Sequence, residues 1–108
     1  MFHLILHSKY FPLKKLSEII SVLENFAPGA YQETYDNSGL IVGSPEMEIS
    51  GALICLDSTE AVVDEALRLK MNLIIAHHPI IFSGLKKING KNYVERTIIK
   101  AIQNNIAI

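Results

Sequence analysis

The chain has 108 residues, of which 49% are hydrophobic and 19% are charged, which is typical of one globular domain with a core. This composition excludes a disordered chain, and no stretch approaches the roughly 18 apolar residues of a membrane helix. The formal net charge is −1 and the only basic pairs are Lys14-Lys15 and Lys86-Lys87, so no nucleic-acid partner is expected.

The N-terminal segment alternates apolar residues with His3 and His7, a pattern that fits either a short strand or a tail. It has neither the positive region nor the cleavage site of a secretory signal, so a cytoplasmic protein is expected. Pro12 suits the first turn of a helix, and apolar residues at helical spacing continue that helix to about Phe26. Residues 39–43 read as a strand between two glycines.

A buried strand is predicted at 51–56, and it contains the single cysteine, Cys55. One cysteine excludes an internal disulfide and fits a reducing compartment. Three polar residues that can cap a helix follow this strand: Asp57, Ser58 and Thr59. Glu60 stands where a reciprocal capping partner of Asp57 would be.

The spacing of strand, helix and strand indicates a βαβ unit, with strands at 51–56 and 72–76 and an amphipathic helix at 61–69 between them. Such a unit implies parallel strands and a right-handed crossover. A helix at 92–103 and the start of a strand at 106–108 would extend the same scheme. The predicted fold is therefore an α/β sheet with helices packed on it.

The third strand ends at a pair of histidines, His77 and His78, followed by Pro79. Imidazole is the commonest metal-ligating side chain. Parallel strands end at one edge of a sheet, so Asp57 joins the histidines where open α/β sheets bind ligands. The histidines are either metal ligands or structural, and Asp57 is a helix N-cap with or without a second, supporting role at the site.

Adjacent side chains of an extended chain point in opposite directions. We therefore expect His77 and His78 to bind two different ions, about 3.5–4 Å apart, rather than to chelate one ion together. Such a site also needs carboxylates. His3 and His7 have the spacing of a helical metal pair, but they lie in a terminus without helical pattern, which disfavours that role.

Three segments resemble motifs of the NIF-three-like family, also called type 2 homologues of GTP cyclohydrolase I. Residues 35–43, Tyr-Asp-Asn-Ser-Gly-Leu-Ile-Val-Gly, resemble W-D-N-x-G-L-x-V-G, with tyrosine in place of the tryptophan. Residues 56–59 resemble L-D-x-T, and residues 75–82 resemble A-H-H-P-L-I-F. The resemblance runs from about Leu13 to the last residue.

The resemblance implies an N-terminal extension at 1–11 and an incomplete NIF-three-like α/β domain at 12–108. It implies a dinuclear divalent-metal site of hydrolase type with His77 and His78 as ligands, in a cytoplasmic protein that forms a toroidal hexamer. The family's other ligands lie in a later H-T-x-x-D motif and near the C-terminus, which this chain lacks. Zinc, iron, manganese and nickel all suit such donors.

Three functions follow as alternatives. The first is a metal-dependent hydrolase or part of one, in which Asp36 and Asn37 either line the cleft or only shape a turn. The second is a non-catalytic module for metal binding or protein interaction. The third is an inactive fragment, because a strand that begins at Ile106 is expected to have no partner element.

Overall fold

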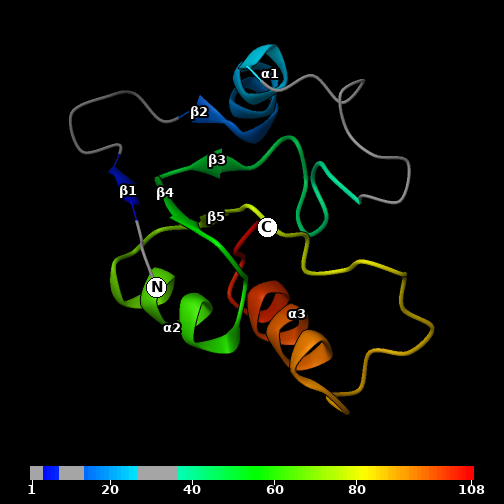
Figure 1. The fold of residues 1–108 in the computed structure, drawn as a ribbon. Helices are drawn as coiled ribbons and strands as arrows, with labels where there is room; N and C mark the ends of the chain where they lie inside the picture. The colour runs from blue at the N-terminus through cyan, green and yellow to red at the C-terminus, as the bar shows by residue number, and fades with distance from the viewer. Residues whose placement is uncertain (1–3, 8–13, 27–36) are drawn as a thin grey trace.

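A computed structural model describes residues 4–7, 14–26 and 37–108, which form helical layers on both faces of a central sheet (Figure 1). Within these residues the sheet has the strand order β1 (Leu4–His7), β4 (Gly51–Cys55), β5 (Leu73–Ala76). β1 runs antiparallel to β4, and β4 and β5 are parallel. The segment that could have been a strand or a tail is therefore an edge strand over Leu4–His7.

The predicted βαβ unit is confirmed. The helix α2 (Glu60–Arg68) connects β4 to β5, and Cys55 pairs with Ala76 at the carboxyl end of the two strands. The β-branched and aliphatic residues of both strands are largely buried, which favours a strand covered on both faces. The mixed α/β fold with a parallel strand pair is thus the one that the sequence predicts.

The C-terminal segment has partners on both sides, so the expectation of an unpartnered strand was wrong. Ala107 forms a parallel bridge with Leu73 of β5. On its other side, Val42 and Ile108 exchange backbone hydrogen bonds of 2.9 and 3.0 Å. Residues 106–108 are buried between β5 and the segment around Val42, and they extend the sheet.

The predicted strand at 39–43 is not formed as such. Gly39 and Gly43 have φ angles of +103° and +119°, outside the extended region, so the segment bends at both ends. Ile41 and Val42 still donate backbone hydrogen bonds to Ile108. The segment therefore contributes an edge contact to the sheet and no regular strand.

The first helix begins later than predicted. Lys14–Lys15 forms the strand β2, which pairs antiparallel with β3 (Glu48–Ile49), and α1 then runs from Leu16 to Phe26. The backbone N–H groups of Leu16 and Ser17 donate to the carbonyls of Met47 and Pro45, at 2.8 and 2.9 Å. These bonds satisfy the free amides of the first turn. Pro12 lies outside the described residues.

The predicted capping arrangement of α2 was wrong in its partners. Thr59 is the N-cap, and its hydroxyl accepts from the amide of Val62 at 3.3 Å. Asp57 lies two residues too early to cap, and its carboxylate contacts His78 instead. The Glu60 carboxylate accepts from Arg96 of the next helix at 2.9 Å, so it does not close a capping box.

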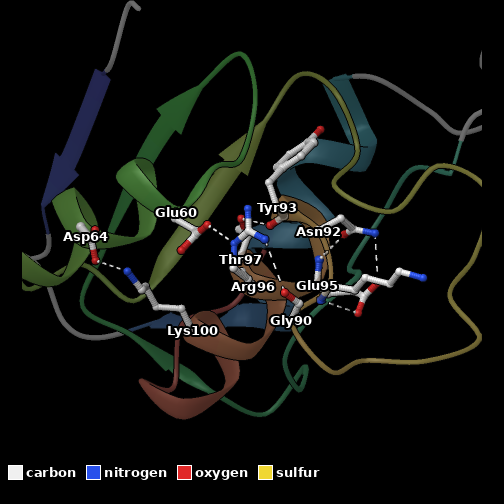
Figure 2. A network of polar contacts seen from close by, with 10 residues as sticks. Glu60, Asp64, Gly90, Asn92, Tyr93, Glu95, Arg96, Thr97 and Lys100 are labelled. Atoms are coloured by element: carbon white, nitrogen blue, oxygen red, sulfur yellow. Dashed lines mark hydrogen bonds and ion pairs between the residues drawn. The ribbon is translucent and has the colours of Figure 1, made fainter.

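The helix α3 (Tyr93–Gln103) begins where predicted. Asn92 is its N-cap and accepts from the amide of Glu95 at 3.0 Å, and its own side-chain amide donates to the Glu95 carboxylate (Figure 2). The Glu95 carboxylate also accepts from the backbone amides of Lys91 and Asn89. Glu95 is buried although it is charged. The carboxylate therefore ties the preceding loop to the start of the helix.

Two clusters of buried side chains lie on opposite faces of the sheet, because alternate strand residues point to opposite sides. Leu53 and Ile74 belong to the cluster beneath α2 and α3, whereas Ala52 and Leu73 belong to the cluster beneath α1. Figure 1 shows α1 above the sheet and α2 with α3 below it. Among the described residues, no helix is long and apolar enough to cross a membrane.

Candidate functional site

The candidate site lies at the carboxyl edge of the β4–β5 pair. The parallel ladder continues past the ends of both strands, where the amides of His77 and His78 donate to the carbonyls of Cys55 and Leu56, each at 3.0 Å. These two bonds hold the backbone of the histidine pair against the start of the loop after β4. Both histidine side chains are exposed, which is where a ligand could reach them.

The two imidazole rings lie beside each other. Their centroids are 4.9 Å apart and their planes are tilted by 55°. The expectation that strand alternation would send the rings of His77 and His78 to opposite sides was therefore wrong. The pair follows the last residue of β5, where the chain bends, so the alternation of a regular strand no longer applies.

Asp57 is brought to the histidines by the same parallel register. Its Oδ1 lies 2.8 Å from Nδ1 of His78, a short contact between exposed side chains. The sequence correctly placed Asp57 at this edge. What the sequence did not predict is the direct contact with one histidine of the pair.

The described residues supply two imidazoles and one carboxylate at this edge, but no group of three side chains arranged to hold a metal ion. Cys55 lies nearby at the end of β4 and is not a suitable additional ligand. Burial raises the pKa of its thiol, and the negative charge of Asp57 raises it further. Since the thiolate is the ligating form, the side chain behaves as a small buried apolar group.

A cavity of about 700 Å³ lies next to the histidines. Its lining combines the apolar side of α1, the residues 37–41, β5 and the segment from His77 to Phe82. This volume is in the range of small-molecule sites. The contribution of α1 was missed by sequence reasoning, although the apolar spacing of Leu16, Ile19, Ile20 and Leu23 could have suggested a face turned toward the sheet.

Asn37 lines this cavity, as one of the two interpretations of the Asp-Asn pair predicts. Its amide Nδ2 donates to the carbonyl of Ile81 at 2.7 Å, which ties the loop before residue 40 to the segment after the histidines. Asp36, Tyr35 and His3 lie outside the described residues, and the structure describes only the backbone of His7, in β1.

Comparison with known proteins identifies relatives along most of the chain. The sequence is 47% identical over 92 residues to the GTP cyclohydrolase 1 type 2 homolog of Staphylococcus epidermidis, covering 85% of this chain and 25% of that protein. It is 42% identical over 94 residues to the protein of the same name from Campylobacter jejuni, covering 87% of this chain and 38% of that protein.

Solved structures agree with the sequence relatives. A Bacillus cereus protein related to NIF3 superposes with a TM-score of 0.83 at 43% identity, over 89% of this chain and 27% of that one. The reduced form of HcgD from Methanocaldococcus jannaschii superposes with a TM-score of 0.77 at 27% identity, over 89% of this chain and 38% of that one.

The chain thus spans about a quarter to two fifths of the length of the relatives it matches. The matched part has the same fold and includes the strand end with the histidine pair. The sequence profile of one family, Duf34/NIF3 (NGG1p interacting factor 3), matches residues 14–108. This chain belongs to the Duf34/NIF3 family.

Proposed function

We propose that this chain is a divalent-metal-binding member of the Duf34/NIF3 family and that His77 and His78 contribute two ligands to a dinuclear site of hydrolase type. The observation that carries this proposal is the position of the two exposed rings, 4.9 Å apart at the carboxyl edge beside a cavity of about 700 Å³. Neutral imidazole binds zinc, iron, manganese and nickel, so the metal is left open.

The donors fit one side of such a site. Two adjacent ions need several further ligands, and carboxylates bridge and neutralise them in hydrolytic centres. Among the described residues only Asp57 adds a carboxylate beside the pair, and it is engaged with His78. The proposed role of this chain is therefore to supply the imidazole side of the centre.

Metal analysis of the purified chain tests the proposal. We expect bound divalent metal after dialysis against zinc or manganese, and its loss in the double variant His77→Ala/His78→Ala. The matched control is His3→Ala/His7→Ala, which removes the chain's other two histidines and should retain the metal. Loss of metal in the control, or none bound by the folded unsubstituted protein, would contradict the proposal. The stoichiometry separates one shared ion from two.

A second candidate function, a non-catalytic interaction module, is supported by exposed apolar side chains in the second half of α1. Val22, Leu23 and Phe26 are exposed there, and Phe26 is 85% exposed. Neighbouring exposed apolar side chains are typical of surfaces that another protein surface covers. We propose that α1 contributes to self-association, of which the toroidal hexamer is the form implied by the family resemblance.

The mass of the particle in solution tests self-association. We expect an assembly larger than a monomer by light scattering, shifted toward the monomer by Phe26→Ser. Ile102→Ser is the control, because Ile102 is also exposed but lies on α3. A monomeric unsubstituted protein would rule out the assembly.

The single cysteine and its buried thiol support the cytoplasm as the proposed compartment.

A further inference from the structure

The two histidines of the pair differ in what holds their rings. Nδ1 of His78 lies 2.8 Å from the Asp57 carboxylate, at hydrogen-bond distance. Among the described residues, the His77 ring has the neighbouring His78 ring as its contact and no hydrogen-bond partner. The site is thus asymmetric, although the sequence presents two identical side chains in a row.

The contact determines which ring nitrogen of His78 carries the proton. An ionised carboxylate only accepts hydrogen bonds, so the nitrogen that faces Asp57 has to be the donor. In the neutral imidazole a proton on Nδ1 leaves Nε2 with a free lone pair. Nε2 is then the nitrogen available to a metal ion. Metal-ligating histidines commonly donate their other ring N–H to a carboxylate in this way.

The backbone makes this contact reproducible. The amide of His78 donates to the carbonyl of Leu56, the residue immediately before Asp57, at 3.0 Å. The extension of the parallel ladder therefore fixes the backbone of His78 beside the backbone that leads into Asp57. Asp57 is not needed to cap α2, because Thr59 does so. The side chain of Asp57 is thus free to orient the ring.

We propose that Asp57 is a positioning residue that holds His78 in the Nδ1–H tautomer and presents Nε2 as a metal ligand, whereas His77 has no such support. This inference rests on the proposed metal-binding function, but its first consequence concerns the metal-free protein. Of the two histidines, only His78 is preorganised as a ligand in the metal-free protein. Its loss costs more affinity than the loss of His77.

Nitrogen-15 NMR of the histidine rings tests the tautomer directly. In the full chain, freed of metal by chelation and held at a mildly alkaline pH, we expect the neutral His78 ring to carry its proton on Nδ1. Asp57→Ala should convert this signal to a tautomer mixture. Asp57→Asn, which keeps an acceptor oxygen, should preserve most of it. The control Asp64→Ala, an exposed aspartate whose partner is Lys100, should leave it unchanged.

Zinc titration supplies the second readout. We expect Asp57→Ala to weaken binding about 10–100-fold and to have no further effect in a His78→Ala background. A His78 ring protonated at Nε2, a tautomer unaffected by Asp57→Ala, or unchanged zinc affinity would each overturn the positioning role. A chain that shows the expected tautomer but binds no metal would refute the proposed function instead, which separates the two failures.

Discussion

At the scale of single residues, Gly43 is the position where backbone and packing constrain the sequence together. Its φ angle is +119°, and a Cβ built on it would lie 2.8 Å from Cβ of Ala107. Gly39 has a similar φ angle of +103°, but a Cβ there would meet nothing within 4 Å. A side chain at either position would strain the backbone, but only a side chain at Gly43 would also collide with a neighbouring residue.

This difference can be measured by substituting each glycine with alanine. Gly39→Ala should cost about 1–2 kcal/mol of unfolding free energy, the strain of a left-handed backbone. Gly43→Ala should cost about 1–3 kcal/mol more, because the new methyl displaces the buried Ala107. Urea unfolding of both variants checks the difference. Equal losses would show that the segment around Val42 does not pack on the C-terminal strand as described.

Glu95 makes the stability of the molecule sensitive to acid. Hydrogen bonds from the amides of Asn89 and Lys91 lower the pKa of its carboxyl group. The resulting stabilisation is complete above the pKa of an ordinary glutamate, about 4.3. It is lost as the pH falls toward the lower pKa that Glu95 has in the folded protein.

We expect Glu95→Gln to be less stable than the unsubstituted protein at pH 7 and to lose less stability on acidification. Urea midpoints measured from pH 7 down to the acid limit of folding check both expectations. Glu24→Gln is the control, since Glu24 is exposed on α1 and should change little. An acid dependence identical in Glu95→Gln and the unsubstituted protein would argue against the role of Glu95.

At the scale of elements, two ion pairs join α2 to α3 in matching steps. Arg96 contacts Glu60 at 2.9 Å, and one turn further along both helices Lys100 contacts Asp64 at 2.8 Å (Figure 2). The hydrogen bond that the Lys100 ammonium donates to the Asp64 carboxylate raises the pKa of Lys100, so this pair weakens only as the pH rises through that raised value. The two contacts show that the two helices run side by side in the same direction.

A double-mutant cycle on the Glu60–Arg96 pair measures this link. Because the pair is partly exposed, we expect a coupling of about 0.2–1 kcal/mol between Glu60→Gln and Arg96→Met. The coupling should shrink at 1 M salt, where screening is strong. A coupling that salt leaves unchanged would show that packing between the helices, rather than charge, produces it.

At the scale of the whole molecule, the C-terminal segment completes the sheet. Ile106 is 2% exposed and Ala107 is fully buried, between β5 and the segment around Val42. Both β5 and the segment around Val42 therefore pack and form hydrogen bonds against residues 106–108. Unfolding of this segment should therefore coincide with loss of the sheet.

We expect Ile106→Ala to lower the unfolding free energy by about 2–5 kcal/mol, a large part of the 5–15 kcal/mol typical of a domain. Ile102→Ala, at an exposed position on α3, should change it by about 0.5 kcal/mol or less. Thermal unfolding followed by circular dichroism compares them. A small effect at Ile106 would indicate that the terminal segment is dispensable.

Short-range sequence patterns predicted some features of the fold and the site correctly and missed others. The start of α3 near Asn92, the approximate ends of β4 and β5, and the histidine pair at the sheet edge follow from short-range signals and were predicted. The cap of α2 was not, because Asp57 and Thr59 are equally good candidates in sequence. Tertiary contact decides between them, since only Asp57 can reach His78 across the parallel register.

By itself, the amino-acid sequence determined the α/β class, the βαβ unit and the placement of Asp57, His77 and His78 at one edge. Hydrophobic periodicity marks the strands and the helix, and the order strand, helix, strand implies parallel strands that end at the same edge. Only the tertiary structure decided that the two rings lie together, that one of them is held by Asp57, and that the terminal strand has partners. Those facts depend on side-chain directions after a strand ends and on hydrogen bonds between distant residues, which no periodicity encodes.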